Sequence, residues 1–150
     1  MTIAQNKTKR QRGFSNFELL IVVVIIGILL AVIFMEFSGV QQKSRDSERK
    51  NDIDGLNVQV QIYQAEKGVY PTLAELNNPS FRKANLKTLD PANLQDPKGK
   101  NQILVAIPQP KAYAYQPAPA GCDNAAHGAC TGYSLTAELE AGGTYSKSSL

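Results

Sequence analysis

The chain has 150 residues, 43% of them hydrophobic, and a formal net charge of +3. This length allows one domain together with a leader or anchor segment. Four lysine and arginine residues precede Gly13, so the chain from Phe14 onward carries a slight negative charge. The positive charge therefore belongs to the N-terminus and not to a binding face, which excludes nucleic acid as a main partner.

An apolar run follows the basic residues. From Leu19 to Met35 no residue is charged, and Gly27 is the only break in the aliphatic pattern. As a helix, the segment from Phe14 to Met35 spans about 33 Å, which is long enough to cross a bilayer. The basic residues on its N-terminal side favour an orientation that leaves the rest of the chain outside the cytoplasm.

Three interpretations of this run compete. It resembles a cleaved secretory signal in its basic start, but it is longer than usual and no A-x-A site follows it. A plain signal anchor leaves Glu18 unexplained, because a charge in mid-membrane costs about 2.5–3.5 kcal/mol on insertion scales. The third interpretation, described next, assigns a function to Glu18.

The string Gly13 to Glu18, GFSNFE, before an aliphatic run resembles the class III signal of type IV prepilins and pseudopilins. The resemblance implies that a prepilin peptidase cuts after Gly13, that the new N-terminal residue Phe14 is N-methylated, and that the apolar helix is kept. It also implies that Gly27, which matches a glycine of many type IV pilins, is a soft point in the helix.

Within this resemblance Glu18 is expected to serve assembly. Cleavage gives Phe14 a positive amine, which Glu18 can neutralise from one helical turn away or from a neighbouring subunit. Pairing offsets much of the cost of burying each charge. The alternative is that Glu18 is a charge near a helix end that extends to the membrane interface.

The helix is expected to continue to Lys67. Residues 41–52 contain no apolar side chain, glycine or proline, which indicates a solvated helix or, alternatively, a flexible linker. An apolar stripe with helical spacing then predicts a core-facing side: Ile53, Leu56, Val60 and Tyr63. Gly68 and Pro71 favour an end to the helix after Lys67.

The remaining residues predict a small head. Thr72 and Glu75 form a capping-box pattern for a short helix. Three segments are strand candidates: Gln102 to Ile107, Lys111 to Gln116, and Tyr133 to Glu140. The first two are expected to form a hairpin, and the three together an antiparallel sheet on the helical stripe, which gives an α+β fold.

Cys122 and Cys130 lie in a loop between the last two strand candidates. Outside the cytoplasm a disulfide is the first expectation. Two alternatives remain open: two free thiols, or a metal site with the pattern C-D-x3-H-x2-C that adds Asp123 and His127 as ligands.

No common catalytic or phosphate-binding motif is present, so neither an enzymatic activity nor a cofactor is expected. A calcium site in the head loops, with Asp96 or Asp123 as a ligand, stays open. The expected organisation is a removed leader over 1–13, a transmembrane and filament-core helix over 14–38, an amphipathic helix over 39–67 and a globular head over 68–150.

The resemblance implies a structural subunit that enters the inner membrane once and then joins an extracellular filament. Its implied partners are copies of itself, the prepilin peptidase that also methylates, a platform membrane protein and an assembly ATPase. A pseudopilin of type II secretion or DNA uptake is the first alternative. A membrane-anchored extracytoplasmic binding module, in which Glu18 is incidental, is the second.

Overall fold

The structure is a computed structural model that describes residues 14–149, without the side chains of residues 35–38. The expected leader, including Gly13, lies outside the described residues. The chain divides into two compact units, of which the first ends at Gly39 and the second, the head unit, begins at Val40. The two units are described separately below.

One helix, α1 (Asn16–Lys67), contributes to both units and has 52 residues. The predicted helix through residues 41–52 is confirmed, and the linker alternative is wrong. The helix ends where Gly68 adopts a φ of 79°, with its N–H donated to the carbonyl of Gln64 at 2.7 Å. A left-handed glycine is a common way to end a helix, because this conformation strains other residues.

Short helical turns follow α1 in the head unit: α2 (Leu73–Asn77), α3 (Pro79–Asn85) and the 3-10 helix η1 (Pro91–Leu94). The predicted capping box of α2 is confirmed, with Glu75 N–H donated to the Thr72 hydroxyl at 3.2 Å and Thr72 N–H donated to the Glu75 carboxylate at 2.8 Å. These turns bring Leu76, Leu86 and Leu94 into the core.

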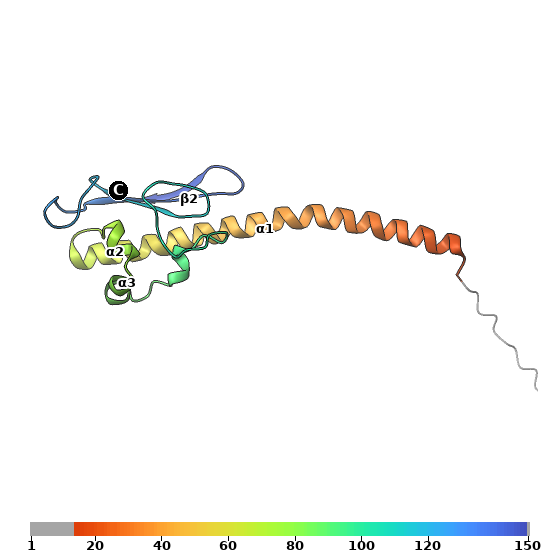
Figure 1. The fold of residues 1–150 in the computed structure, drawn as a ribbon, viewed down its shortest axis with the longest axis horizontal. Helices are drawn as coiled ribbons and strands as arrows, with labels where there is room; N and C mark the ends of the chain where they lie inside the picture. Colours follow the sequence, from red (N-terminus) through yellow and green to blue (C-terminus); the bar gives the residue numbers. More distant parts are fainter. Residues whose placement is uncertain (1–13, 150) are drawn as a thin grey trace, which may run out of the picture. The chain divides into compact units, whose positions relative to one another are not determined.

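Three antiparallel strands form one sheet in the order β1 (Ala114–Ala118), β2 (Gly132–Glu138) and β3 (Thr144–Ser148). In Figure 1 the sheet and α3 lie on opposite sides of the C-terminal part of α1. The predicted stripe from Ile53 to Tyr63 is buried in a core shared with Tyr115 and Leu135. The α+β fold is confirmed.

Two tyrosine hydroxyls, one from β2 and one from the residue just before β1, donate hydrogen bonds to side chains of α1. Tyr113 donates to Asp52 at 2.7 Å, and Tyr133 donates to Asn57 at 2.6 Å. Since both rings are buried, the hydrogen bonds satisfy hydroxyls that would otherwise cost free energy. Burial, followed by the hydrogen bond to Asp52, raises the pKa of Tyr113.

Two strand predictions need correction. Gln102 to Ile107 is not a strand of the sheet; Val105 alone bridges to Ala114, in a parallel sense. The side chain of Asn77 takes the place of a neighbouring strand, since it both donates to the Leu104 carbonyl and accepts its N–H, at 2.9 and 2.8 Å. The predicted hairpin is therefore wrong.

The third strand is instead β3, which was not predicted. It pairs with β2 after a turn that contains Gly142 and Gly143, both with positive φ. The other two candidates overlap the observed strands β1 and β2, and the loop with the two cysteines connects those strands. The strand number was right and one strand was misplaced.

Candidate functional site

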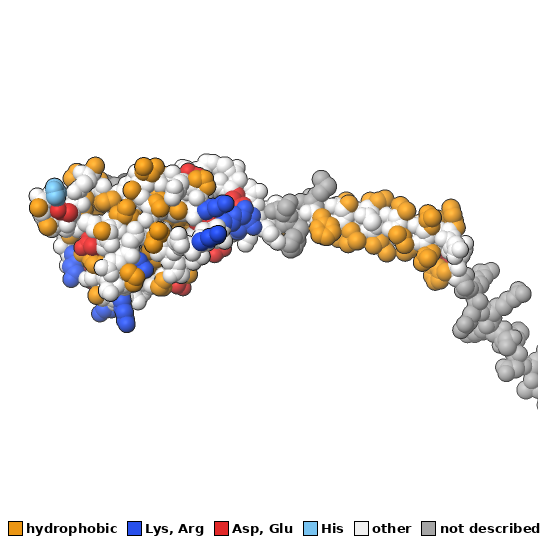
Figure 2. All heavy atoms as spheres, viewed as in Figure 1, with side chains coloured by type: hydrophobic (Ala, Val, Ile, Leu, Met, Phe, Trp, Pro, Cys, Tyr) orange, Lys and Arg blue, Asp and Glu red, His pale blue; other side chains and the backbone are white. Residues whose placement is uncertain are grey.

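The described part of the N-terminal unit exposes apolar side chains along its length in the view of Figure 2. Every large apolar residue from Phe14 to Phe34 has at least 42% of its surface accessible. By length and composition, α1 is long and apolar enough to cross a membrane. An apolar surface this continuous marks contact with lipid or with another protein.

Glu18 lies in the first turn of this apolar helix and is exposed. The turn is closed by Ser15, whose hydroxyl accepts the N–H of Phe17 at 3.3 Å and whose carbonyl accepts the N–H of Leu19 at 3.1 Å. Phe14 directly precedes this cap and is 78% exposed. The formed turn therefore keeps Glu18 about one helical turn from Phe14.

Gly27 lies inside the same helix with nothing within 4 Å of the position where a Cβ would stand. Nothing among the described residues therefore requires a glycine there. The roles predicted for Gly13, Phe14, Glu18 and Gly27 stay predictions.

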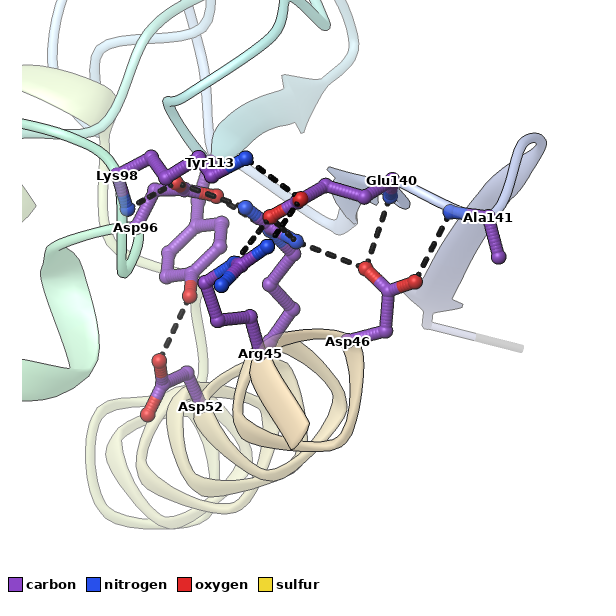
Figure 3. A network of polar contacts seen from close by, with 9 residues as sticks. Arg45, Asp46, Asp52, Asp96, Lys98, Tyr113, Glu140 and Ala141 are labelled. Atoms are coloured by element: carbon purple, nitrogen blue, oxygen red, sulfur yellow. Dashed lines mark hydrogen bonds and ion pairs between the residues drawn. The ribbon is translucent and has the colours of Figure 1, made fainter. Parts of the chain in front are cut away.

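The head unit contains a buried ionic cluster centred on Arg49 of α1, which is 2% exposed (Figure 3). Its guanidinium donates twice to Asp96, at 2.6 and 3.1 Å, and once to Asp46 at 2.7 Å. Nη1 of Arg49 also lies 2.9 Å from a carboxylate oxygen of Glu140. One cation thus joins α1 to the loop after η1 and to the turn after β2.

A second layer surrounds this cluster (Figure 3). Arg45 donates two hydrogen bonds of 2.7 Å to the Glu140 carboxylate, and the Lys98 ammonium donates one of 2.6 Å to the same carboxylate. The backbone N–H groups of Glu140 and Ala141 donate to Asp46 at 2.8 and 3.0 Å. We call the set Arg45, Asp46, Arg49, Asp96, Lys98 and Glu140 the neck cluster.

The hydrogen bonds of the neck cluster favour the charged forms of Arg49, Asp46 and Glu140. The hydrogen bond to Asp96 raises the pKa of Arg49 against the opposing effect of burial. Burial works against ionisation of Asp46, but the backbone donors and Arg49 outweigh it and lower its pKa. Hydrogen bonds from Arg45 and then Lys98 lower the pKa of Glu140. The cluster is therefore held together by ionised groups at neutral pH.

This cluster corrects the interpretation of residues 41–52 as a solvated stretch of helix. Asp46 and Arg49 are buried, although the helix itself was predicted. Asp46 and Arg49 are three residues apart on the helix, a spacing that allows them to pair, and the structure has this pair. Nothing local indicated that Asp96 and Glu140 complete the cluster.

The expected disulfide between Cys122 and Cys130 is present. Both alternatives, free thiols and thiolate metal ligands, are therefore wrong. The bridged loop is fastened to the segment after α1 by Tyr70, whose N–H donates to the Cys130 carbonyl at 2.8 Å and whose carbonyl accepts the Asn124 amide at 2.8 Å.

The acidic residues considered for calcium have partners of their own. Asp96 holds Arg49, and Asp123 is 2.6 Å from the imidazole of His127. The hydrogen bond with His127, and then two backbone N–H groups, lower the pKa of Asp123 to about 2. Over residues 14–34 and 39–149 no group of three or more His, Cys, Asp and Glu side chains is arranged to hold a metal ion.

Replacing both cysteines by serine should lower the free energy of unfolding of the head by about 2–3 kcal/mol, the chain-entropy value for a loop this short. Denaturant titration of the oxidised wild type against the Cys122→Ser/Cys130→Ser variant measures the difference. Reducing the wild type should reproduce the same loss. Equal stability of all three samples would show that Tyr70 and Asn124 hold the loop without the bridge.

Part of the chain is similar to curated pilins and secretion pseudopilins. It is 33% identical over 64 residues to type II secretion system core protein G of Dickeya chrysanthemi, which is 43% of this chain and 42% of that protein. Its relatives are pilins and pseudopilins. They include the type IV major pilin protein PilA of Myxococcus xanthus, 40% identical over 65 residues, and the fimbrial protein EcpC of Eikenella corrodens, 39% identical over 61 residues.

These matches cover 43% and 41% of this chain, and 30% and 40% of the respective relatives. The chain thus spans less than half the length of the curated relatives that it matches. No protein-family model matches the chain, and no solved structure does.

Proposed function

We propose that the chain is a structural subunit of a type IV pilus-like filament, processed after Gly13 and polymerised through packing of its N-terminal helix. The observation that carries the proposal is the exposed apolar surface from Phe14, just before α1, to Phe34, with a single carboxylate, Glu18, in the first turn of the helix. Pilins and pseudopilins are the relatives of this chain, and such proteins build filaments.

The apolar surface explains two stages of this function. Before assembly, the helix is inserted once in the inner membrane, where lipid covers the exposed side chains. After assembly, copies of the same helix cover one another, so the apolar surface stays out of contact with water. The head then lies outside the cytoplasm and forms the filament surface.

Glu18 is proposed to pair with the amine of processed Phe14, in its own chain or in a neighbour. The Ser15 cap keeps the first turn of the helix formed, and Glu18 lies in that turn, which supports a pairing with the nearby amine. A pair between subunits also fixes how far one helix shifts along another. The peptidase, the platform protein and the assembly ATPase are the partners proposed for these steps.

A pseudopilin of type II secretion is the second candidate, favoured by the relatives named core protein G. The subunit chemistry is the same in both cases, and the difference lies in filament length and in the machine that it serves. Deleting the gene distinguishes them: loss of long surface filaments supports the pilus, and retention of exoproteins in the periplasm supports the pseudopilus.

Gly13→Val should leave the basic leader attached, because the peptidase must approach the backbone at the cut and a β-branched side chain blocks that approach. Intact-mass measurement of the membrane-extracted protein should then give the unprocessed chain. Gly27→Val is the matched control, since it makes the same change within the helix and should be cleaved normally. A Gly13→Val protein of mature mass would place the cleavage site elsewhere.

A further inference from the structure

Three cations of the head unit lie together on α3 and the turn after it. Arg82 and Lys83 belong to α3, and Lys87 follows its last residue. Among residues 14–34 and 39–149 none of the three pairs with a carboxylate, whereas the cations of the neck cluster all do. Figure 2 shows Lys and Arg side chains gathered at the lower left of the head, over the helix that Figure 1 labels α3.

These cations line a groove of about 360 Å³, formed by α3, η1 and the turn between them. The other residues that line it are apolar: Pro79, Leu86, Leu89 and Pro91. Leu86 and Leu89 belong to the head core, so the floor of the groove is held by the fold itself. An apolar floor with a few polar groups at its rim is the usual composition of a binding site.

Arg82 is positioned in this groove by the neighbouring helix. Its Nη1 donates to the carbonyl of Leu76 in α2 at 2.6 Å. A guanidinium has five N–H donors, so this hydrogen bond orients the group and leaves donors for a ligand. Lys83 and Lys87 are exposed and add two positive charges on flexible side chains.

One carboxylate stands next to the groove. Asp90 lies between the lining residues Leu89 and Pro91, and its side chain accepts the N–H of Ala92 at 2.9 Å as the cap of η1. Three cations beside one carboxylate leave the groove with a net positive charge. The groove therefore attracts an anionic ligand.

A second hollow extends the groove. It lies between α1 and α3, encloses about 450 Å³, and shares Lys87 with the groove. Glu66 and Lys67 both line this hollow, so it adds length to the surface but little net charge. An extended ligand that crosses Lys87 can reach both hollows, which a compact ligand cannot.

The apolar floor decides which kind of anion fits. A nucleic acid strand gains much of its affinity by stacking bases on aromatic side chains, and none of the described residues that line the groove is aromatic. An inorganic anion would leave Leu86 and Leu89 uncovered. We propose that the groove binds an extended acidic segment of another protein, whose carboxylates meet the three cations while its apolar side chains cover the floor. This inference goes beyond the filament function and does not depend on assembly.

Fluorescence anisotropy with the full-length, detergent-extracted protein tests the groove. The probe is a labelled peptide that repeats Glu-Pro-Leu and that its prolines keep extended. Lys87→Glu should weaken its binding about tenfold, because an attractive charge becomes a repulsive one. Lys43→Glu is the matched control and should bind as the wild type does, since Lys43 precedes Gln59, the first residue of α1 at the second hollow, by about 24 Å. Both lysines are exposed, so neither change should unfold the head.

Two further peptides test the class of ligand. A peptide that repeats Glu-Pro-Ser should bind at least about tenfold more weakly than the Glu-Pro-Leu probe, because it leaves the apolar floor in water. A peptide that repeats Lys-Pro-Leu measures uptake by the detergent micelle and should not bind, because the cations repel it. Equal binding of either peptide and of the Glu-Pro-Leu probe would overturn the inference, and so would equal binding of the probe to Lys87→Glu and the wild type.

The same experiment separates the other possible occupants. Tighter binding of an oligothymidylate than of the Glu-Pro-Leu probe would overturn the inference in favour of a nucleic acid. Failure of all the peptides to bind would also overturn it, and loss of filaments in Lys87→Glu but not in Lys43→Glu would then assign the groove to a contact between copies. Each of these results leaves the filament function standing. A wild-type protein that binds the probe but never assembles would overturn the filament function and support the groove.

Discussion

Arg49→Leu should lower the free energy of unfolding of the head by about 3–5 kcal/mol, the usual loss when one partner of a buried ion pair is removed. The substitution leaves Asp46 and Asp96, which are 6% and 2% exposed, without the cation that holds them. Near-UV circular dichroism during denaturant titration follows the loss, because six tyrosines and no tryptophan report on the head.

Arg45→Leu is the matched control. It makes the same change one turn earlier on α1, where the guanidinium is 25% exposed and pairs with Glu140. An ion pair this open to solvent contributes little to stability, so the control should unfold nearly as the wild type does. Similar losses from both substitutions would mean that burial of Arg49 does not set the stability of the neck cluster.

Glu18→Leu should give a mature, membrane-embedded protein that forms few or no filaments. The change removes an insertion cost of up to about 3 kcal/mol, so entry into the membrane improves. It also leaves the proposed amine of Phe14 unpaired among apolar helices, where an isolated charge is expensive. Electron microscopy of sheared filaments, beside immunoblots of the membrane fraction, measures both effects.

Two further variants separate charge from polarity at this position. Asn16→Leu removes a polar side chain from the same exposed helix start and should still assemble. Glu18→Asp keeps the carboxylate one methylene shorter and should give an intermediate number of filaments. Normal filament numbers from Glu18→Leu would show that the carboxylate is incidental and would favour the plain membrane anchor.

Local patterns were enough to predict α1 and α2, whereas α3 and η1 were not predicted. The 3.6-residue spacing from Ile53 to Tyr63 identified the face that the core buries, and Gly68 marked the end of α1. The Thr72–Glu75 capping box was likewise readable, because both partners lie within one turn. Each of these features depends on neighbours three or four residues away.

The strands were harder because their identity depends on what pairs with them. Gln102 to Ile107 is apolar enough for a strand, but the Asn77 side chain takes the hydrogen bonds of Leu104 that a neighbouring strand would use. β3 is short, polar and at the edge of the sheet, with alternating exposure, so its composition gives little signal. Only its partner β2 makes it a strand.

The neck cluster lay beyond sequence reasoning for the same reason. Asp46 and Arg49 lie within residues 41–52, which were predicted to form a solvated helix, and their spacing is that of an ordinary exposed ion pair. Their burial depends on Asp96, 47 residues after Arg49, and on Glu140, 95 residues after Arg45. No periodicity links such distant positions, and the charge pattern of a helix alone does not tell a solvated face from a buried ionic one.

The N-terminus of the mature protein tests the proposed filament subunit most directly. Filaments or membrane-extracted protein should be digested and the N-terminal peptide sequenced by mass spectrometry. The proposed function predicts a first residue of Phe14 carrying a methyl group, with the basic leader absent and the apolar helix retained. An intact Met1, or a start beyond the apolar helix, would contradict it.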